Sequence, residues 1–389
     1  MLWPFSINWR RDPIERLEWL TSIVVSQNDT EDAVSVRTGA RRFLNVATVV
    51  AGDDERVLYE NTVIAGQADS YDLPLFMDAA FVTEAVADVD VEIAVDSTVG
   101  KSFSIGAEVV LLSEGSAAIE TVESIEEDSI TLAGAPGEFP VGTKIIPLVK
   151  ARIQAAQPLT YLSDGVMTAD VEFSFDDEWI GSPASESADY RGCPVFIART
   201  DWGENRSAQI ARNIHVFDNV VGKPGYRDKA GVHRARYPHR WVLEGRQELA
   251  EFRAWIAARR GRYAPFWAPS NLDDFKVTGN IGSAATSITV ANRKHAMVAG
   301  EVGRRDIMIE LHNGTRYYRR ITDIAPSGTT ETLTIDSALG ANVAASDIAR
   351  VSYMRLMRLA SDTVEIAYKK DDVAIVKLNF MSKRDSDDE

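Results

Sequence analysis

The residue types that carry out chemistry are present in this 389-residue chain, but their spacing matches no catalytic or metal-binding motif. A zinc site requires cysteine and histidine ligands at suitable spacing, and the chain has one cysteine, Cys193, and five histidines. Of these, His233 and His239 lie six residues apart among arginine, tyrosine and proline residues. This context is more typical of a polar pair on a strand edge than of a metal site, so we expect no metal ion and no cofactor.

Carboxylates are abundant, and some pairs are expected by chance. Residues 176–178 and 371–372 are runs of acidic side chains without the loop spacing of a calcium site, and we interpret both as solvated turns. The Gly-x-Ser-x-Gly motif of a nucleophilic serine is absent. Residues 279–283 lack the Gly-Lys-Ser/Thr ending of a phosphate-binding loop. We therefore predict no catalytic residues and a protein that is not an enzyme. A polysaccharide-degrading enzyme is the remaining catalytic alternative, because its two carboxylates can come from distant parts of a chain.

Charge is distributed unevenly along the chain, whose net charge is −16. Residues 1–175 contain 11 basic and 29 acidic residues, a net charge of −18. The remainder contains 31 basic residues (42 less 11) and 29 acidic residues (58 less 29), a net charge of +2. An acidic chain repels phosphate, which disfavours general binding of nucleic acid. The contrast between the halves predicts that acidic surfaces of the first contact basic surfaces of the second, in the same chain or a neighbouring one.

A single cysteine excludes an internal disulfide bond and indicates a reducing compartment. The first eleven residues have no basic region followed by an apolar run, so we expect no signal peptide. No stretch approaches the roughly 18 apolar residues that a membrane span requires.

The most informative pattern is an internal repeat, which is sought first because missing it leads to the wrong fold. Residues 109–116 and 307–315 both have the pattern of a strand, a turn containing glycine (Gly115 and Gly314) and the start of a second strand. Helices are predicted over 54–65 and 246–260, and a glycine follows each. Other matching pairs are 37–43 with 234–241, 73–76 with 264–267, 129–132 with 332–335, 150–153 with 356–359, and 171–175 with 376–380.

The repeat and its alternating strands predict a mainly β fold of tandem duplicated β-sandwich or small-barrel modules, each with one short helix and an inserted small β-domain. The predicted organisation is an N-terminal arm (1–13), a first copy (14–176, insert about 80–150), a linker (177–213), a second copy (214–381, insert about 278–352) and a disordered acidic tail (382–389).

Large aromatic residues and clustered arginines are the candidates for an interface between subunits. Tryptophans near the N-terminus suit an arm that docks on a neighbouring chain. The arginine clusters suit a protein–protein surface better than a nucleic-acid surface, because the second half is only near neutral. The predicted interface residues are Trp3, Trp9, Arg234, Arg236, Arg240, Arg304, Arg305, Arg319 and Arg320.

Two segments of the chain resemble distal tail and baseplate-hub proteins of long-tailed bacteriophages. One is the arginine-rich strand over residues 37–43. The other, the stronger match, is the helix that ends in Ala257-Ala258-Arg259-Arg260-Gly261, followed by Pro265-Phe266-Trp267 and Asp273-Asp274-Phe275. Members of this family form rings at the tip of the tail tube and join the tube to baseplate or fibre proteins. The resemblance implies a structural virion protein with no catalytic residues and no cofactor.

The resemblance also implies partners and a location. We expect a homo-oligomer in the virion tail, assembled in the host cytoplasm, in contact with tail tube, hub and fibre proteins. Since the chain is duplicated, three copies can meet a sixfold tube, so a homotrimer with pseudo-sixfold symmetry is expected and a hexamer is the alternative. DNA would pass through such a ring without specific binding. The alternative function is a carbohydrate- or receptor-binding baseplate module, because exposed tryptophan and tyrosine can form a sugar-binding platform.

Overall fold

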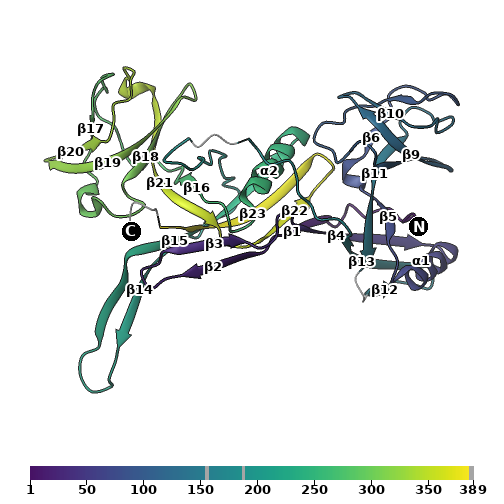
Figure 1. Cartoon of the computed structure of the whole chain (residues 1–389), viewed down its shortest axis with the longest axis horizontal. Helices are drawn as coiled ribbons and strands as arrows, with labels where there is room; N and C mark the ends of the chain where they lie inside the picture. The colour runs from purple at the N-terminus through teal and green to yellow at the C-terminus, as the bar shows by residue number, and fades with distance from the viewer. Residues whose placement is uncertain (154–156, 186–188, 385–389) are drawn as a thin grey trace.

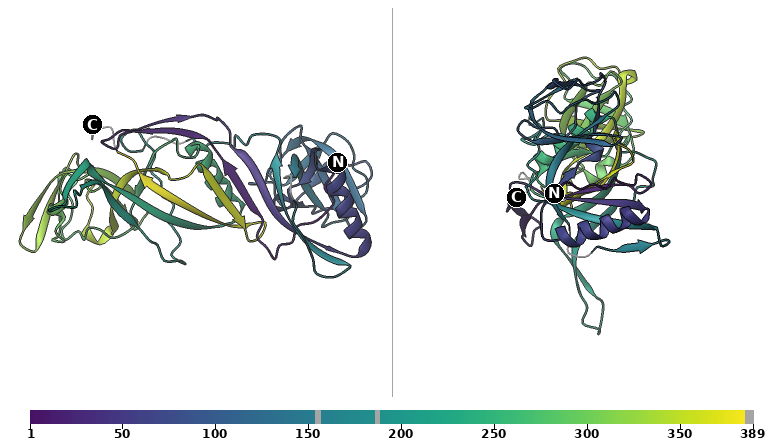
Figure 2. Two further views of the ribbon diagram at one scale, coloured as in Figure 1. Left: turned by 90° about the horizontal axis from the view of Figure 1, so that it is seen from below. Right: turned by 90° about the vertical axis from the view of Figure 1, so that its right-hand side faces the viewer.

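The computed structural model describes residues 1–153, 157–185 and 189–384 (Figures 1 and 2). Strands hold 48% of residues and helices 10%, with two α-helices in the described part of the chain, so the predicted mainly β fold is confirmed. One large sheet extends along the molecule, and a small β-domain rises from each end of it (Figure 1).

In its described residues, the first half of the chain contains one α-helix and thirteen of the strands. Its elements are β1 (Ile14–Glu18), β2 (Thr21–Val25), β3 (Glu31–Ser35), β4 (Arg41–Ala51), α1 (Asp53–Gly66), β5 (Tyr71–Pro74), η1 (Phe76–Asp78), β6 (Ala80–Phe81), β7 (Glu92–Ala94), β8 (Glu108–Ser113), β9 (Ser116–Ile125), β10 (Ser129–Leu132), β11 (Lys144–Ile153), β12 (Leu159–Tyr161) and β13 (Val166–Phe175).

The second half begins with a long two-stranded arm that extends away from the sheet (Figure 1). Its elements are β14 (Gln209–Phe217), β15 (Gly225–Glu244), α2 (Arg246–Arg259), β16 (Phe266–Pro269), β17 (Ser287–Ala291), η2 (His295–Val298), β18 (Asp306–Leu311), β19 (Arg316–Ser327), β20 (Thr330–Ile335), η3 (Ala345–Asp347), β21 (Ile348–Leu359), β22 (Thr363–Tyr368) and β23 (Val373–Ser382).

The two halves have the same strand connectivity. In the first, β5 pairs with β11, β11 with β13, and β13 with β4. In the second, β16 pairs with β21, β21 with β23, and β23 with β15. In the first insert, β8 pairs with β9 and β11, and β10 pairs with β7 and β9. In the second insert, β18 pairs in the same way with β19 and β21, and β20 with β17 and β19. The sequence repeat is therefore a structural duplication.

The helices show that the duplication extends to local detail. Each has 14 residues and follows a glycine with positive φ, Gly52 at 106° and Gly245 at 88°. Glycine is required there because a side chain is strained in this backbone region. The residue before each glycine, Ala51 or Glu244, donates its backbone N–H to a glutamate of the first helical turn, Glu55 or Glu248, at 2.9 Å.

A constant numbering offset relates the N-terminal parts of the copies. Thr21 pairs with Ser35 as Ile214 pairs with Asp228, so the offset is 193 (214 less 21 and 228 less 35). The helices share it (246 less 53). The hairpin of β2 and β3 is thus the counterpart of the β14–β15 arm.

The last strands have a larger offset because the second insert is longer. Leu159 pairs with Ala169 as Ile366 pairs with Val376, so the offset is 207 (366 less 159 and 376 less 169). By these offsets residues 207–211, which include the start of β14, are the counterpart of β1, and β22 is the counterpart of β12.

The predicted N-terminal arm belongs to the first copy, and the latter part of the predicted linker, from about residue 195, belongs to the second. Leu2 forms a parallel bridge with Asp72, and Val195 forms the equivalent bridge with Trp267. Trp3 is only 1% exposed. The copies therefore run from about residue 2 to 175 and from about 195 to 382. Isolated bridges of this kind leave no periodic pattern in the sequence, which is why the boundaries were misplaced. Residues 186–188 of the predicted linker and 385–389 of the predicted tail lie outside the described residues.

Three main cores hold the molecule together. Each insert has its own apolar cluster. The largest cluster contains side chains of both copies, among them Trp3, Leu17, Val364 and Phe380. The copies are therefore fused through a common core.

Candidate assembly interface

Strand β1 joins the two copies into one sheet. It pairs antiparallel with β4 of its own copy and with β22 of the second copy. Alternation along β1 turns Glu15 and Leu17 toward the core, where they are 1% and 0% exposed. A charged residue at a core-facing position needs a partner, and this is the sequence signal that was missed.

Glu15 lies in a buried polar cluster built from both copies. Arg42 of β4 donates to it at 2.7 Å, and Tyr368 of β22 donates its hydroxyl at 2.7 Å. Arg253 of α2 forms an ion pair with the same carboxylate. Burial alone would raise the pKa of Glu15, but the charges of Arg253 and Arg42 outweigh burial and lower the pKa to about 2.

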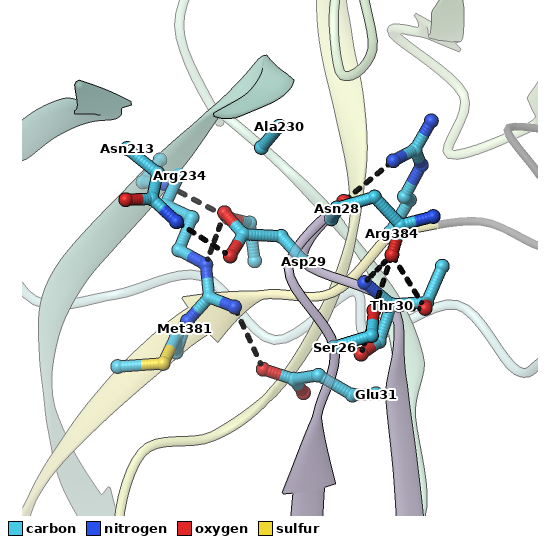
Figure 3. A network of polar contacts seen from close by, with 12 residues as sticks. Ser26, Asn28, Asp29, Thr30, Glu31, Asn213, Ala230, Arg234, Met381 and Arg384 are labelled. Atoms are coloured by element: carbon cyan, nitrogen blue, oxygen red, sulfur yellow. Dashed lines mark hydrogen bonds and ion pairs between the residues drawn. The ribbon is translucent and has the colours of Figure 1, made fainter. Parts of the chain in front are cut away.

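The β2–β3 hairpin forms a second polar contact with the other copy (Figure 3). Asp29, at the tip of the hairpin, accepts from Arg234 of β15 at 2.9 Å. Glu31 accepts from Arg358 of β21 at 2.7 Å and lies 3.6 Å from Arg234. Arg384 donates to the backbone carbonyl of Asn28 at 2.6 Å.

Asp362, which precedes β22, holds the base of the same hairpin. Its carboxylate accepts from the hydroxyl of Thr21 at 2.8 Å and from the backbone N–H of Arg262 at 2.8 Å. Its carbonyl accepts from the backbone N–H of Trp19 at 3.0 Å. The hairpin is therefore fixed along its length to the second copy.

The charge contrast predicted from the sequence appears at this junction. Among the described residues, each ion pair that links the two copies has its acid in the first copy and its base in the second, as in Asp29 with Arg234, Glu15 with Arg253, and Glu31 with Arg358. Asp78 with Arg246, at 2.8 Å, and Asp12 with Lys369 follow the same rule. The acidic first half and the more basic second half are thus complementary within one chain.

The junction uses different surfaces of two equivalent units. The first copy contributes β1 and its hairpin, and the second contributes β22 and α2. The counterparts of these surfaces are uncovered. Ile210, counterpart of Leu17, is 56% exposed, and Tyr161 is 54% exposed where its counterpart Tyr368 is 0% exposed. One chain therefore contains one completed junction and leaves the counterpart of each of its two surfaces exposed.

The structure places the predicted aromatic interface residues in different environments. Trp3 packs on Phe5, Tyr59 and Phe173 in the core of the first copy, which corrects its prediction as part of a docking arm. Trp9 is partly exposed. Its counterpart by the 193 offset is Trp202, which no sequence pattern singled out.

Most of the predicted arginines contact groups of their own chain. Arg234 binds the hairpin as described, whereas Arg236 is exposed on β15, opposite Gln209 of β14. The others contact their own copy: Arg240 with Asp201, Arg304 over the Tyr353 ring at 4.7 Å, Arg305 and Arg320 with Asp306 at 3.8 and 2.8 Å, and Arg319 with the carbonyls of Tyr318, Ser337 and Ala338.

No group of three or more histidine, cysteine, aspartate or glutamate side chains in the described residues could hold a metal ion. Burial, with Arg355 adjacent, lowers the pKa of His233 to about 4. Burial, with Arg206 adjacent, lowers the pKa of His239 to about 3. Neither imidazole is charged at neutral pH. No helix in the described part is long and apolar enough to cross a membrane.

A pocket of about 240 Å³ lies in the second copy, between its sheet and its insert. Its lining includes Arg206, His239, Arg304 and Tyr353, and the 59% exposed Trp202 lies at the same site. The guanidinium of Arg206 lies over the Trp202 ring at 4.9 Å. An exposed indole beside polar groups could bind a small polar ligand.

Comparison with known proteins gives no assignment. No protein-family model matches the chain, and no curated protein matches its sequence.

Proposed function

We propose that this chain is a structural, ring-forming protein of a phage tail tip, a distal tail or baseplate-hub adaptor that joins the tail tube to baseplate or fibre proteins. The observation that carries the proposal is the junction between its copies, in which two equivalent units contact each other through different surfaces. Contacts of this head-to-tail kind close into rings when the rotation between units permits. The resemblance of the arginine-rich strand and of the segment after α2 to such proteins points to the tail tip.

The duplication sets the expected stoichiometry. Each chain supplies two equivalent units, so three chains supply the six positions of a sixfold tube. The proposed assembly is a homotrimer with pseudo-sixfold symmetry, and a hexamer is the competing stoichiometry. The proposed location is the virion tail. DNA would pass the acidic ring without specific binding.

The proposal assigns no catalytic role to any residue. The proposed role of the buried Glu15 cluster and of the hairpin contacts is to fix the angle between the two copies. That fixed angle would set the curvature of the ring.

Electron microscopy of the purified protein tests the proposal. Class averages should show closed rings with three- or sixfold symmetry. Particles that remain single elongated monomers at high concentration would contradict it. Immunogold labelling of parent particles should then place the chain at the tail tip and not along the tube.

A carbohydrate- or receptor-binding baseplate module is the second candidate function, favoured by the exposed Trp202 beside its pocket. A glycan array probed with the protein and with Trp202→Ala separates the two functions. Specific binding that Trp202→Ala abolishes would support the receptor-binding function, and the absence of specific binding would reject it.

A further inference from the structure

Resting on the proposed ring, we propose that the free edge of β12 in one molecule pairs antiparallel with residues 206–208, which lead into β14, in the next. This contact would repeat between chains the β22–β1 pairing that joins the copies within a chain. The partner is therefore a second copy of this chain. The surface is specified by the junction that the structure contains.

The offsets give the register of the proposed contact. Within the chain, Ile14 lies opposite Ala367 and Glu15 lies opposite Ile366. Adding 193 to the first residue of each pair and subtracting 207 from the second places Ser207 opposite Thr160 and Ala208 opposite Leu159. All residues in this alignment belong to the described part of the chain.

The backbone groups needed for the ladder are the ones that face outward. Within the chain, Tyr368 donates its N–H to the carbonyl of Pro13, and Trp19 donates to that of Asp362. Hydrogen-bonded positions alternate along an antiparallel pair. The equivalent positions of the proposed contact are Tyr161 opposite Arg206 and, in alternation, Leu159 opposite Ala208.

Pro158, which cannot donate, does not obstruct this ladder. It lies one residue from Leu159, at a position whose N–H would point away from β14. Its placement is therefore compatible with the proposed contact.

The charge of the helix residue is reversed between the internal junction and the proposed contact. Within the chain, α2 contributes a cation, Arg253, and β1 contributes the anion Glu15. The counterpart of Arg253 by the 193 offset is Glu60 of α1, which accepts a hydrogen bond from the hydroxyl of Tyr161 at 2.8 Å. Tyr161 would lie opposite Arg206. The proposed contact thus pairs Glu60 of one chain with Arg206 of the next.

Arg206 is suited to this role. It is partly buried, donates to the Pro238 carbonyl at 3.3 Å, lies over the Trp202 ring at 4.9 Å, and forms no ion pair with a carboxylate of the residues that the structure describes. A contact between two first copies would bring Glu60 close to Glu15, and a contact between two second copies would bring Arg253 close to Arg206. Both contacts are repulsive, so the contact between a first copy and a second copy is favoured.

Disulfide trapping tests the strand pairing. The variant Thr160→Cys with Ser207→Cys, in a Cys193→Ser background, places both thiols at a position without cross-strand hydrogen bonds, where Cα atoms approach to about 4.5 Å. We expect covalent dimers and trimers on a non-reducing gel. Ile14→Cys with Ala367→Cys, the same position of the internal junction, should form its disulfide within single chains. Thr160→Cys with Gln209→Cys, two residues out of register, should not cross-link.

Charge reversal tests the ion pair independently. Glu60→Arg and Arg206→Glu should each weaken self-association on the order of tenfold, and the double variant should restore it. Circular dichroism confirms that each variant folds. Rings that form normally in all three variants, without the disulfide, would overturn this contact but leave the ring intact. A wild-type chain that stays monomeric would overturn both the contact and the ring.

Discussion

Replacing Glu15 by glutamine should destabilise the common core of the two copies by about 3 kcal/mol. The pKa of Glu15 is about 2 against an ordinary value of 4.5, and a difference of about 2.5 pKa units corresponds to about 3 kcal/mol. Removing one partner of a buried ion pair typically costs about 3–5 kcal/mol, because the other charge stays buried without compensation. Here the residue left behind is chiefly Arg253, with Arg42 beside it.

The assay is urea unfolding followed by tryptophan fluorescence. Four of the eight tryptophans lie in the common core, and neither insert contains a tryptophan, so fluorescence reports chiefly on the common core. The four are Trp3, Trp19, Trp241 and Trp255. Glu172→Gln is the matched control, because its ion pair with Arg16 is about one-third exposed and such pairs contribute about 1 kcal/mol or less.

The same variant has a defined pH dependence. The folded-state pKa of Glu15 is depressed, so its contribution is fully present above pH 4.5 and is lost as the pH falls toward 2. In Glu15→Gln the part of the acid destabilisation that comes from this group should be missing. A cost below 1 kcal/mol, or an unchanged pH dependence between 4.5 and 2, would refute the assignment of this cluster as the link between the copies.

Three further predictions follow from the duplication and its contacts. Gly52→Ala and Gly245→Ala should each lower the free energy of unfolding by about 1–3 kcal/mol, and by similar amounts. The cost is backbone strain, because both glycines have positive φ and neither new Cβ would meet an atom within 4 Å; thermal denaturation of the two variants measures it. Trp3→Ala should cost about 3–5 kcal/mol in urea unfolding, whereas Trp202→Ala should change stability by about 0.5 kcal/mol or less, since only the first side chain is buried. Asp29→Ala should release the hairpin tip from Arg234, so that hydrogen exchange of β2 and β3 rises while that of β4 stays unchanged.

The sequence predicted the parts of the fold that have regular periodicity. The helices predicted over 54–65 and 246–260 are present as Asp53–Gly66 and Arg246–Arg259. The turn glycines Gly115 and Gly314 have positive φ, as the hairpin pattern requires. The match of residues 150–153 with 356–359 has the offset that the structure shows, because an arginine recurs at the same position of β11 and β21.

Other alignments were displaced because composition is a poor guide to register. Residue 37 was matched with residue 234, whereas the strand pairing makes Arg41 the counterpart of Arg234. The two arginine-rich stretches have arginines in several positions, so a shift by four residues still aligns basic side chains. Pro74 was likewise matched with Pro265, although Pro269 occupies its place in the strand.

The candidate site was predicted only in outline. The charge contrast between the halves indicated a complementary contact, but the residues named for it were mostly arginines of the second copy. The acidic residues of the junction, Glu15, Asp29 and Glu31, were missed because each is one of 29 acids in the first half. Only the alternation Ile14-Glu15-Arg16-Leu17 marks Glu15 as core-facing, and its partner Arg253 is far away in the sequence.

The mass of the assembled protein tests the central proposal most directly. Three chains of 42.8 kDa give about 128 kDa (three times 42.8), and native mass spectrometry or light scattering resolves this value from one or six chains. We expect a closed trimer, whose mass does not grow further as the concentration rises. A mass of 42.8 kDa at every concentration, or an open series of ever larger species, would contradict it.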